Sequence, residues 1–190
     1  MFVKAAPGQA AALAKQLQQS DPKDPMASHY LLLRHQEGAD WDYCVIRHVG
    51  TKASVEITAP PPNVDAPTRA WHEDTFVAGP PWAEFERLMG LTGDQSATAV
   101  YVVGVHRPAP GHRQQLAQAL RRPSPNAKVA SNSVMMAHVE GGPWQFLTID
   151  RYGSWQDFGA DRAASATGEG WLEVRQHSAF HSDTIADRVR

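Results

Sequence analysis

Residues 35–50 of this chain are written a second time at residues 138–153. The two segments, HQEGADWDYCVIRHVG and HVEGGPWQFLTIDRYG, align without a gap and share a histidine, a glutamate, two glycines, a tryptophan and an isoleucine. The same offset of 103 residues (138 minus 35) places PGQAAALAKQL, residues 7–17, on PGHRQQLAQAL, residues 110–120. An internal repeat of this length predicts two copies of one supersecondary unit, which strongly limits the folds open to the chain.

A second alignment relates the later parts of the two copies. Residues 82–100 match residues 171–189 at an offset of 89 (171 minus 82), with Trp82 on Trp171. The change of offset predicts about 14 additional residues (103 minus 89) in the first copy. We expect them to include a surface loop at 57–68, ITAPPPNVDAPT, because its prolines are incompatible with a regular helix or a central strand.

Each copy shows the same series of local patterns. A short β-rich run ends at Pro-Gly, a turn signal, and leucines at helical spacing follow it. Two apolar runs joined by a glycine-containing turn then predict a β-hairpin. Trp82, Phe85 and Met89 lie at i, i+3 and i+7, which predicts a helix that Gly90 caps. With a final strand the order is β-α-β-β-α-β, the split βαβ arrangement of ferredoxin-like domains.

The predicted fold class is therefore α+β, with one ferredoxin-like repeat at 1–97 and a second at 98–190. Two such units in one chain resemble the dimeric α/β-barrel superfamily in a tandem, two-copy form. Members of that superfamily include antibiotic-biosynthesis monooxygenases, polyketide cyclases, stress-responsive barrel proteins and haem-binding chlorite dismutase-like proteins. The resemblance implies that the two sheets wrap into an intrachain α/β barrel. A monomer would then be the minimal competent unit, and a homodimer remains compatible with the pattern.

Alternation along the repeated hairpins separates two faces of each strand pair. The faces that carry only apolar side chains include Cys44 and Leu147, and we expect helices to pack on them. The other faces combine aromatic and polar side chains, as small-molecule pockets do, and we expect them to line the barrel interior. The predicted substrate-binding residues on these faces are Trp41, Tyr43 and Arg47 in the first copy and Trp144, Phe146 and Asp150 in the second.

These residues have alternative interpretations. For Trp41 and Trp144 the alternative is a packing role in the core or in the hairpin turns. Arg47 and Asp150 occupy equivalent positions in the two copies. A pseudo-twofold relation would bring them together as an ion pair, whereas a place at the strand ends would expose both to solvent.

The segment WLEVRQHSAFHSDTIADRV, residues 171–189, carries two histidines and an aspartate. The alignment predicts a helix from Trp171 to about residue 179 and a strand over 181–189, so His177 and His181 do not share one helical face. It also makes both histidines a feature of the second copy alone. They are interpreted as solvated or helix-capping residues, as acid/base or substrate-binding residues, or as metal or haem ligands. No HExxH motif or cysteine cluster is present, and we predict no metal site.

Composition excludes several classes of partner. The net charge is −2 and no dense Lys/Arg run occurs, so neither nucleic acid nor a membrane surface is predicted as a partner. The single cysteine, Cys44, lies in an apolar run and predicts a buried, inert thiol.

The sequence shows no secretory signal, which predicts a cytoplasmic protein. The alternative is export, since the first strand of the first copy looks clipped at Met1 and the natural chain would then begin upstream with a leader.

The leading functional hypothesis is a small-molecule-binding or enzymatic barrel. By the resemblance, it would be a cofactor-free monooxygenase or cyclase that acts on an apolar aromatic or enolisable substrate. His177 and His181 would carry protons, and Asp183 would orient them. The first alternative is haem binding, with His177 or His181 as the iron ligand, which a Soret band in the purified protein would reveal. The second is a non-catalytic, stress-related barrel.

Overall fold

The structure of the chain is a computed structural model, and it describes residues 1–19, 26, 28–51, 67–92, 98–123, 132–165 and 168–189. Nine strands and five helices lie in this described part, so the predicted α+β class is confirmed. The strands are β1 (Phe2–Ala5), β2 (Tyr30–Glu37), β3 (Tyr43–Arg47), β4 (Arg69–Glu73), β5 (Phe76–Ala78), β6 (Val100–Pro108), β7 (Ser133–Glu140), β8 (Phe146–Tyr152) and β9 (Ser178–Arg188). The helices are α1 (Ala10–Gln18), α2 (Trp82–Leu88), α3 (Arg113–Arg121), α5 (Trp155–Ser165) and α6 (Glu169–His177).

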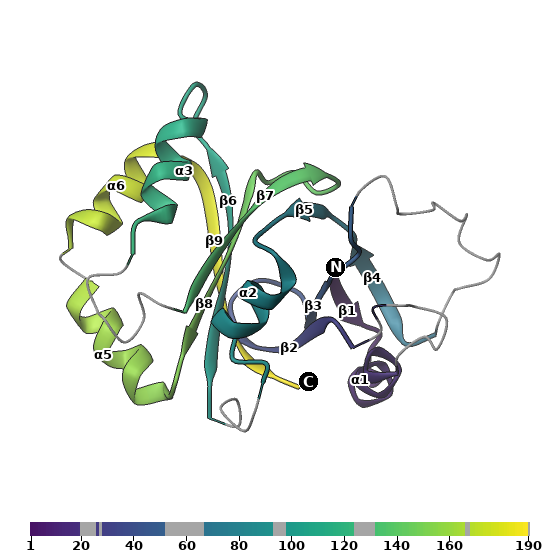
Figure 1. Ribbon diagram of the computed structural model, residues 1–190. Coiled ribbons are helices and arrows are strands. Elements are labelled where there is room, and N and C mark those ends of the chain that lie inside the picture. The colour runs from purple at the N-terminus through teal and green to yellow at the C-terminus, as the bar shows by residue number, and fades with distance from the viewer. Residues whose placement is uncertain are drawn as a thin grey trace.

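All nine strands belong to one antiparallel sheet in the order β4-β1-β3-β2-β9-β6-β8-β7-β5 (Figure 1). The two ends of this sheet, β4 and β5, are separated in the chain only by Asp74 and Thr75. A link of two residues spans at most about 11 Å, so the sheet curls until its two edges lie near each other. β4 and β5 do not pair with each other, and the sheet is not closed.

The last strand of each half connects the two halves. β9 pairs with β6 of its own half along most of its length, and its end also pairs with β2 of the first half. In the first half, β4 and β5 together take the place that β9 has in the second half. β4 pairs with β1 of its own half, and β5 pairs with β7 of the second half. Both halves are therefore joined through sheet hydrogen bonds within a single chain.

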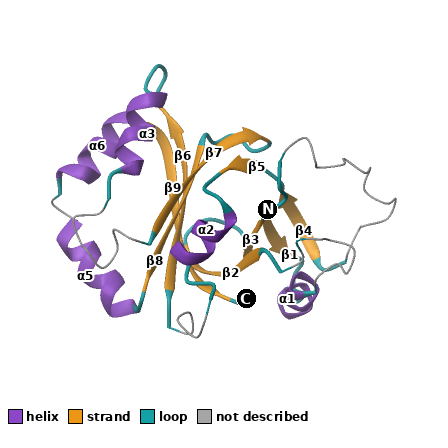
Figure 2. Ribbon diagram, viewed as in Figure 1, coloured by secondary structure: helices purple, strands orange, loops and turns teal. Residues whose placement is uncertain are grey.

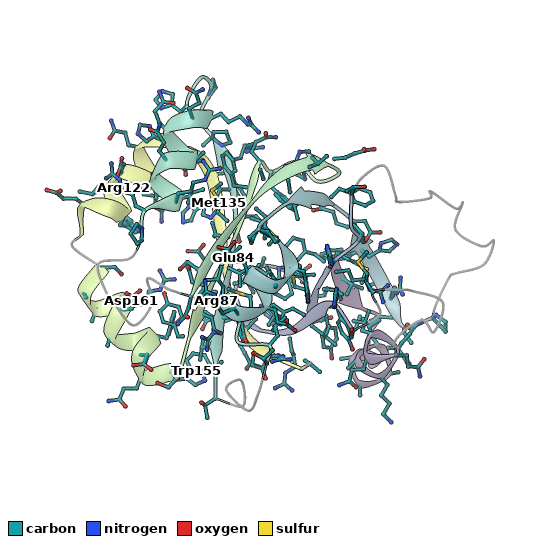
Figure 3. The ribbon with its side chains drawn as sticks, viewed as in Figure 1. Glu84, Arg87, Arg122, Met135, Trp155 and Asp161 are labelled. Carbon is teal, nitrogen blue, oxygen red and sulfur yellow. The ribbon has the colours of Figure 1, made fainter. Side chains whose placement is uncertain are left out.

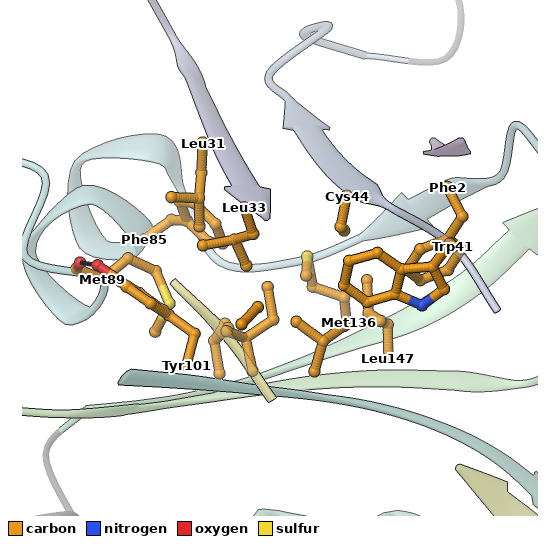
Figure 4. Packing of buried hydrophobic residues seen from close by; sticks show 14 of the residues in the cluster. Phe2, Leu31, Leu33, Trp41, Cys44, Phe85, Met89, Tyr101, Met136 and Leu147 are labelled. Atoms are coloured by element: carbon orange, nitrogen blue, oxygen red, sulfur yellow. Dashed lines mark hydrogen bonds between the residues drawn. The ribbon is translucent and has the colours of Figure 1, made fainter. Parts of the chain in front are cut away.

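The inner face of the curled sheet is packed with apolar side chains from both halves. Leu31, Leu33 and Cys44 of the first half face Leu147 and other residues of the second half (Figure 4). Phe85 and Met89 fill one end of this core, and the Tyr101 hydroxyl donates a hydrogen bond to the Met89 carbonyl at 2.9 Å. Phe2 and Trp41 lie at the other end of the core, away from α2 (Figure 4).

Cys44 is fully buried in this core. Burial raises the pKa of its thiol to about 11, so the thiol is protonated near neutral pH. The predicted burial of Cys44 is confirmed.

Helices cover the outer face of the sheet in both halves (Figure 2). Leu13 and Leu17 of α1 pack on Tyr43 and Val45. In the second half, α3 and α6 pack over Phe146, while the ring of Phe158 in α5 meets Tyr152 edge-on at 5.3 Å. None of the helices in the described part of the chain is long and apolar enough to cross a membrane.

The predicted assignment of the two strand faces is wrong. Tyr43 and Phe146 lie on the outer face under helices, whereas Cys44 and Leu147 lie on the inner face. Alternation separates two faces but cannot say which is enclosed, because here both are buried, one by helices and one by opposing strands. Trp41 and Trp144 do reach the inner core. They precede strands β3 and β8, so the alternation of those strands does not extend to them.

The second predicted alignment is also wrong. α2 follows β5, whereas α6 precedes β9, so Trp82 and Trp171 do not occupy equivalent places. Strand pairing instead relates residues 72–76, HEDTF, to residues 181–185, HSDTI, at an offset of 109 (181 minus 72). The second half is thus longer by six residues (109 minus 103) before its last strand, and the first half has no insertion of 14. Residues 57–66 of the predicted loop lie outside the described residues.

Other boundaries are confirmed. A helix covers 82–88, and Gly90 follows it with φ +62°, the left-handed conformation expected of a C-terminal cap. α6 ends at His177 and β9 begins at Ser178, so the two histidines lie on different elements as predicted.

Candidate functional site

Three neighbouring strands of the second half bring polar side chains together on the outer face. In the antiparallel ladders, Gly104 of β6 lies between Asp183 of β9 and Thr148 of β8, and His106 lies opposite His181. Residues at i and i+2 of a strand share a face, so all these side chains project on the same side. We call His106, Thr148, His181 and Asp183 the outer polar cluster.

Gly104 makes room for the outer polar cluster. A Cβ atom at residue 104 would lie 2.6 Å from Thr148 Oγ1, 2.8 Å from His106 Nε2 and 2.9 Å from Asp183 Oδ1. These distances are shorter than real side chains allow, so any larger residue would displace at least one polar group. The three groups converge on the space that the glycine leaves open.

His106 is the buried member of the cluster, with 5% of its surface exposed. Its Nε2 lies 2.9 Å from Thr148 Oγ1, and its Nδ1 has no hydrogen-bond partner among the described residues. Burial lowers the pKa of His106 to about 4, although the nearby Asp183 carboxylate acts in the opposite direction. The imidazole is therefore neutral at neutral pH.

The first half builds the equivalent layer from different residues. At the offset of 103, Val3 corresponds to His106 and Val45 to Thr148. Val3 and Val45 are buried in the apolar core under α1. A sheet of this kind is therefore covered by helices without a buried imidazole, so stability does not explain the polar residues of the second half. Burial of a polar group with an unpaired atom typically costs about 1–3 kcal/mol, which favours a functional reason for His106.

The histidine–aspartate pair itself occurs in both halves. His72 and Asp74 of the first half match His181 and Asp183, and His72 Nδ1 lies 3.1 Å from Asp74 Oδ2 at the surface. The inference that the histidines belong to the second copy alone is wrong for His181. What distinguishes the second half is the buried imidazole of His106 beside the pair.

The remaining predicted residues of the outer face do not form one site. His177 ends α6, and its Nδ1 lies 2.9 Å from Nδ1 of His112, which is not a member of the outer polar cluster. Asp150 is half-buried on the helix-covered face, where burial raises its pKa while a hydrogen bond from Ser133 lowers it. Arg47 is exposed and lines a cavity of about 550 Å³ at the end of β3. Within the described residues Arg47 and Asp150 form no ion pair with each other.

A second, smaller cavity lies on the inner face and contains two of the predicted substrate-binding residues. It has a volume of about 240 Å³, and its aromatic lining residues are Phe2, Trp41, Trp71 and Trp144. Asp40, Glu73, Ser182 and Thr184 contribute polar groups. We call this space the inner cavity. Both halves of the chain contribute to its walls.

Trp41 and Trp144 are equivalent residues that frame the inner cavity from opposite halves. The Phe2 ring contacts both, at 5.4 Å from Trp41 and 6.4 Å from Trp144 between ring centroids. Each tryptophan also meets an equivalent histidine edge-on, His35 at 5.6 Å and His138 at 5.9 Å. Both indoles are buried, and both also border the inner cavity.

Equivalent backbone contacts hold the two hairpin turns that carry these tryptophans. The Ala39 amide donates to Thr184 Oγ1 at 3.1 Å, and the Gly142 amide donates to Thr75 Oγ1 at 3.1 Å. The turn of the first half therefore rests on β9 of the second half, and the turn of the second half rests on the link between β4 and β5. These two contacts tie the turns that carry Trp41 and Trp144 to the opposite halves.

Sequence reasoning missed Trp71, Glu73 and His106. The repeated H-x-D-T segment, residues 72–75 and 181–184, was the signal that could have found the strand carrying Trp71 and Glu73. Among the described residues, no three His, Cys, Asp or Glu side chains are arranged to hold a metal ion. In comparisons with protein-family models, with curated proteins and with solved structures, none matches this chain.

Proposed function

We propose that the chain consists of two tandem ferredoxin-like units and binds a small molecule in the inner cavity between them. The observation that carries this proposal is the convergence of aromatic side chains from both halves, among them Trp41 and Trp144, around a space that they leave unfilled. Apolar walls with a few convergent polar groups are the usual composition of small-molecule sites.

The strand order supports the tandem architecture. The first half has the order β4-β1-β3-β2, and the second half has the order β9-β6-β8-β7. The same relative order in both halves is what two copies of a split βαβ unit would give. A single chain supplies every wall of the inner cavity named here, so we propose the monomer as the minimal binding unit.

The six tryptophans of the chain provide an internal control for binding. Trp41, Trp71 and Trp144 line the inner cavity, whereas Trp82, Trp155 and Trp171 do not. In a titration of ¹⁵N-labelled protein with cyclohexanol or phenol, we expect the indole resonances of the first three to shift. Shifts confined to the other three would contradict the proposal.

Val105→Phe is expected to fill the inner cavity and to weaken binding of both probes by about tenfold or more. Val105 lines the cavity, and its equivalent in the first half is Phe2, so the fold already accommodates a phenyl ring at this place in the repeat. The matched control is Val139→Phe at an exposed residue of β7, which should leave binding unchanged. Isothermal titration calorimetry measures both. Undiminished binding by the Val105→Phe variant would place the probe elsewhere.

The outer polar cluster favours a second candidate function, proton transfer to or from a small molecule. His181 is half-buried and Asp183 is exposed, so both are accessible, while His106 supplies a neutral imidazole beside them. Histidine and aspartate are common general bases. We propose His181 as the proton carrier and Asp183 as the group that stabilises its charged form.

Deuterium exchange of cyclohexanone tests this second candidate, because exchange at the carbon next to the carbonyl requires only removal and return of a proton. The protein should accelerate exchange in D₂O, and His181→Gln should lower the rate by about tenfold or more. The matched control is His72→Gln in the equivalent H-x-D-T segment of the first half. Equal rates for the two variants, or no rate above buffer, would reject this candidate.

A further inference from the structure

The charge of the inner cavity indicates the class of its ligand. Resting on the proposed function, we propose that the cavity binds a small organic cation, with an ammonium or quaternary ammonium group held between indole rings and the carboxylate of Glu73. The argument rests on the aromatic walls, on the sign of the lining charges and on the space made for one carboxylate.

The aromatic walls offer faces that attract a cation. Three of the four aromatic lining residues are tryptophans, the side chain with the strongest cation–π attraction. Trp71 lines the cavity with 39% of its surface exposed to solvent, so its ring is accessible to an incoming group. The Phe2 ring contacts both of the other two tryptophans, Trp41 and Trp144.

The charged groups of the inner cavity have one sign. Among its described lining residues, the ionisable side chains are Asp40 and Glu73, and no lysine, arginine or histidine is present. Asp40 already forms an ion pair with Lys4. Glu73 accepts a hydrogen bond from Trp144 Nε1 at 3.1 Å, and within the described residues it forms no ion pair. A neutral indole N–H orients this carboxylate without cancelling its charge.

Gly142 shows that the chain makes room for this carboxylate. A Cβ atom at residue 142 would lie 2.3 Å from Glu73 Oε1 and 2.8 Å from Trp144 Nε1, so a larger residue would displace the carboxylate or the indole from their present positions. Gly142 does not have a positive φ, and backbone conformation therefore does not require glycine there. Its equivalent in the first half is Ala39, whose amide contacts β9. On β9 the residue equivalent to Glu73 is Ser182, which carries no charge. Glycine thus occurs at the turn that meets the carboxylate, and alanine at the turn that does not.

The volume limits the size of the ligand. Pockets for drug-sized molecules are typically about 300–1,000 Å³, and the inner cavity has about 240 Å³. The ligand is therefore a small amine, or the cationic head of a larger molecule whose remainder leaves the cavity past Trp71.

Choline and its neutral isostere 3,3-dimethylbutan-1-ol provide the test, because they have nearly the same shape and differ in charge. Both are titrated into the full chain at constant ionic strength, and the tryptophan indole resonances give the dissociation constants. We expect choline to bind at least about tenfold more tightly than the alcohol. Glu73→Gln should remove this preference, because it keeps an acceptor for Trp144 Nε1 and removes the charge. The matched control is Glu84→Gln on the exposed face of α2 (Figure 3), which should leave the preference intact.

Two results would overturn the proposal. Equal affinity of the folded wild-type protein for choline and for the alcohol would show that the cavity does not select a positive charge. The cation proposal would then be rejected, while the proposed binding of a small molecule would stand. Binding of neither molecule would reject both the cation proposal and the proposed function.

If Glu73→Gln does not fold, as judged by the Trp82 indole resonance, Trp71→Leu replaces it, with Trp171→Leu as the exposed control. Trp71→Leu should then weaken choline binding, and unchanged choline affinity in that variant would also overturn the proposal.

Discussion

Gly38→Ala and Gly141→Ala are each expected to lower the free energy of unfolding by about 3 kcal/mol. Both glycines have a positive φ, +130° and +119°, which L side chains rarely adopt. A Cβ atom at residue 38 would lie 2.5 Å from the Asp183 carbonyl, and one at residue 141 would lie 2.4 Å from the Asp74 carbonyl. Neither backbone can retreat without breaking the crossing between hairpin turn and last strand.

Gly8→Ala and Gly111→Ala are the matched controls. These glycines also have a positive φ, +76° and +81°, but a Cβ atom at either meets nothing within 4 Å. Only the backbone term remains, and we expect a loss of about 1 kcal/mol. Chemical denaturation at constant pH measures all four variants. Equal losses for the two pairs would show that the hairpin turns do not rest on the opposite half as described.

The second large effect is a dependence of stability on pH that comes from His106. The pKa of His106 is about 4 in the folded protein, whereas an unfolded histidine has its ordinary value near 6.5. Between these two values the unfolded chain binds the proton and the folded chain does not, so stability falls as the pH falls. From pH 6.5 to pH 4.5 this group should cost the wild type about 2 kcal/mol.

His106→Val removes this contribution and introduces the residue found at the equivalent Val3. We therefore expect the free energies of unfolding of the variant and the wild type to diverge as the pH is lowered, in favour of the variant. Denaturant titrations at several pH values give the comparison. Parallel curves for His106→Val and wild type would mean that His106 is protonated in the folded state or is not buried.

Some parts of this fold could be predicted from sequence because they depend on local chemistry. Pro-Gly turns before α1 and α3, the hairpins at Gly38 and Gly141, and the helix at 82–88 all rest on backbone preferences of a few residues. The ungapped match of 35–50 with 138–153 identified the equivalent tryptophans for the same reason.

The enclosed face of the sheet could not be predicted from alternation. Tyr43 and Cys44 are both buried, and the pattern holds no information on whether helices or strands cover each of them. The last strand of the first half was missed because its similarity to the second half is confined to a few residues around HEDTF. The match of residues 82–100 with residues 171–189 is longer but accidental. Only the match of residues 72–76 with residues 181–185 identifies the strand that brings Glu73 to the inner cavity.

The residues of the outer polar cluster come from three strands that are distant in sequence. His106, Thr148 and Asp183 meet only through the register of β6 with β8 and β9. His181 and Asp183 stood out as a local pair, but the buried partner that distinguishes them from His72 and Asp74 could be recognised only in three dimensions.

Direct contact between a bound probe and the tryptophans tests the central claim, that a small molecule occupies the inner cavity between the two halves. The methyl protons of choline or 3,3-dimethylbutan-1-ol give one intense signal, suited to intermolecular nuclear Overhauser effects. We predict such effects to the ring protons of Trp41, Trp71 and Trp144, which line the inner cavity. Effects confined to the exposed rings of Trp155 and Trp171, or to the imidazoles of His106 and His181, would contradict the account.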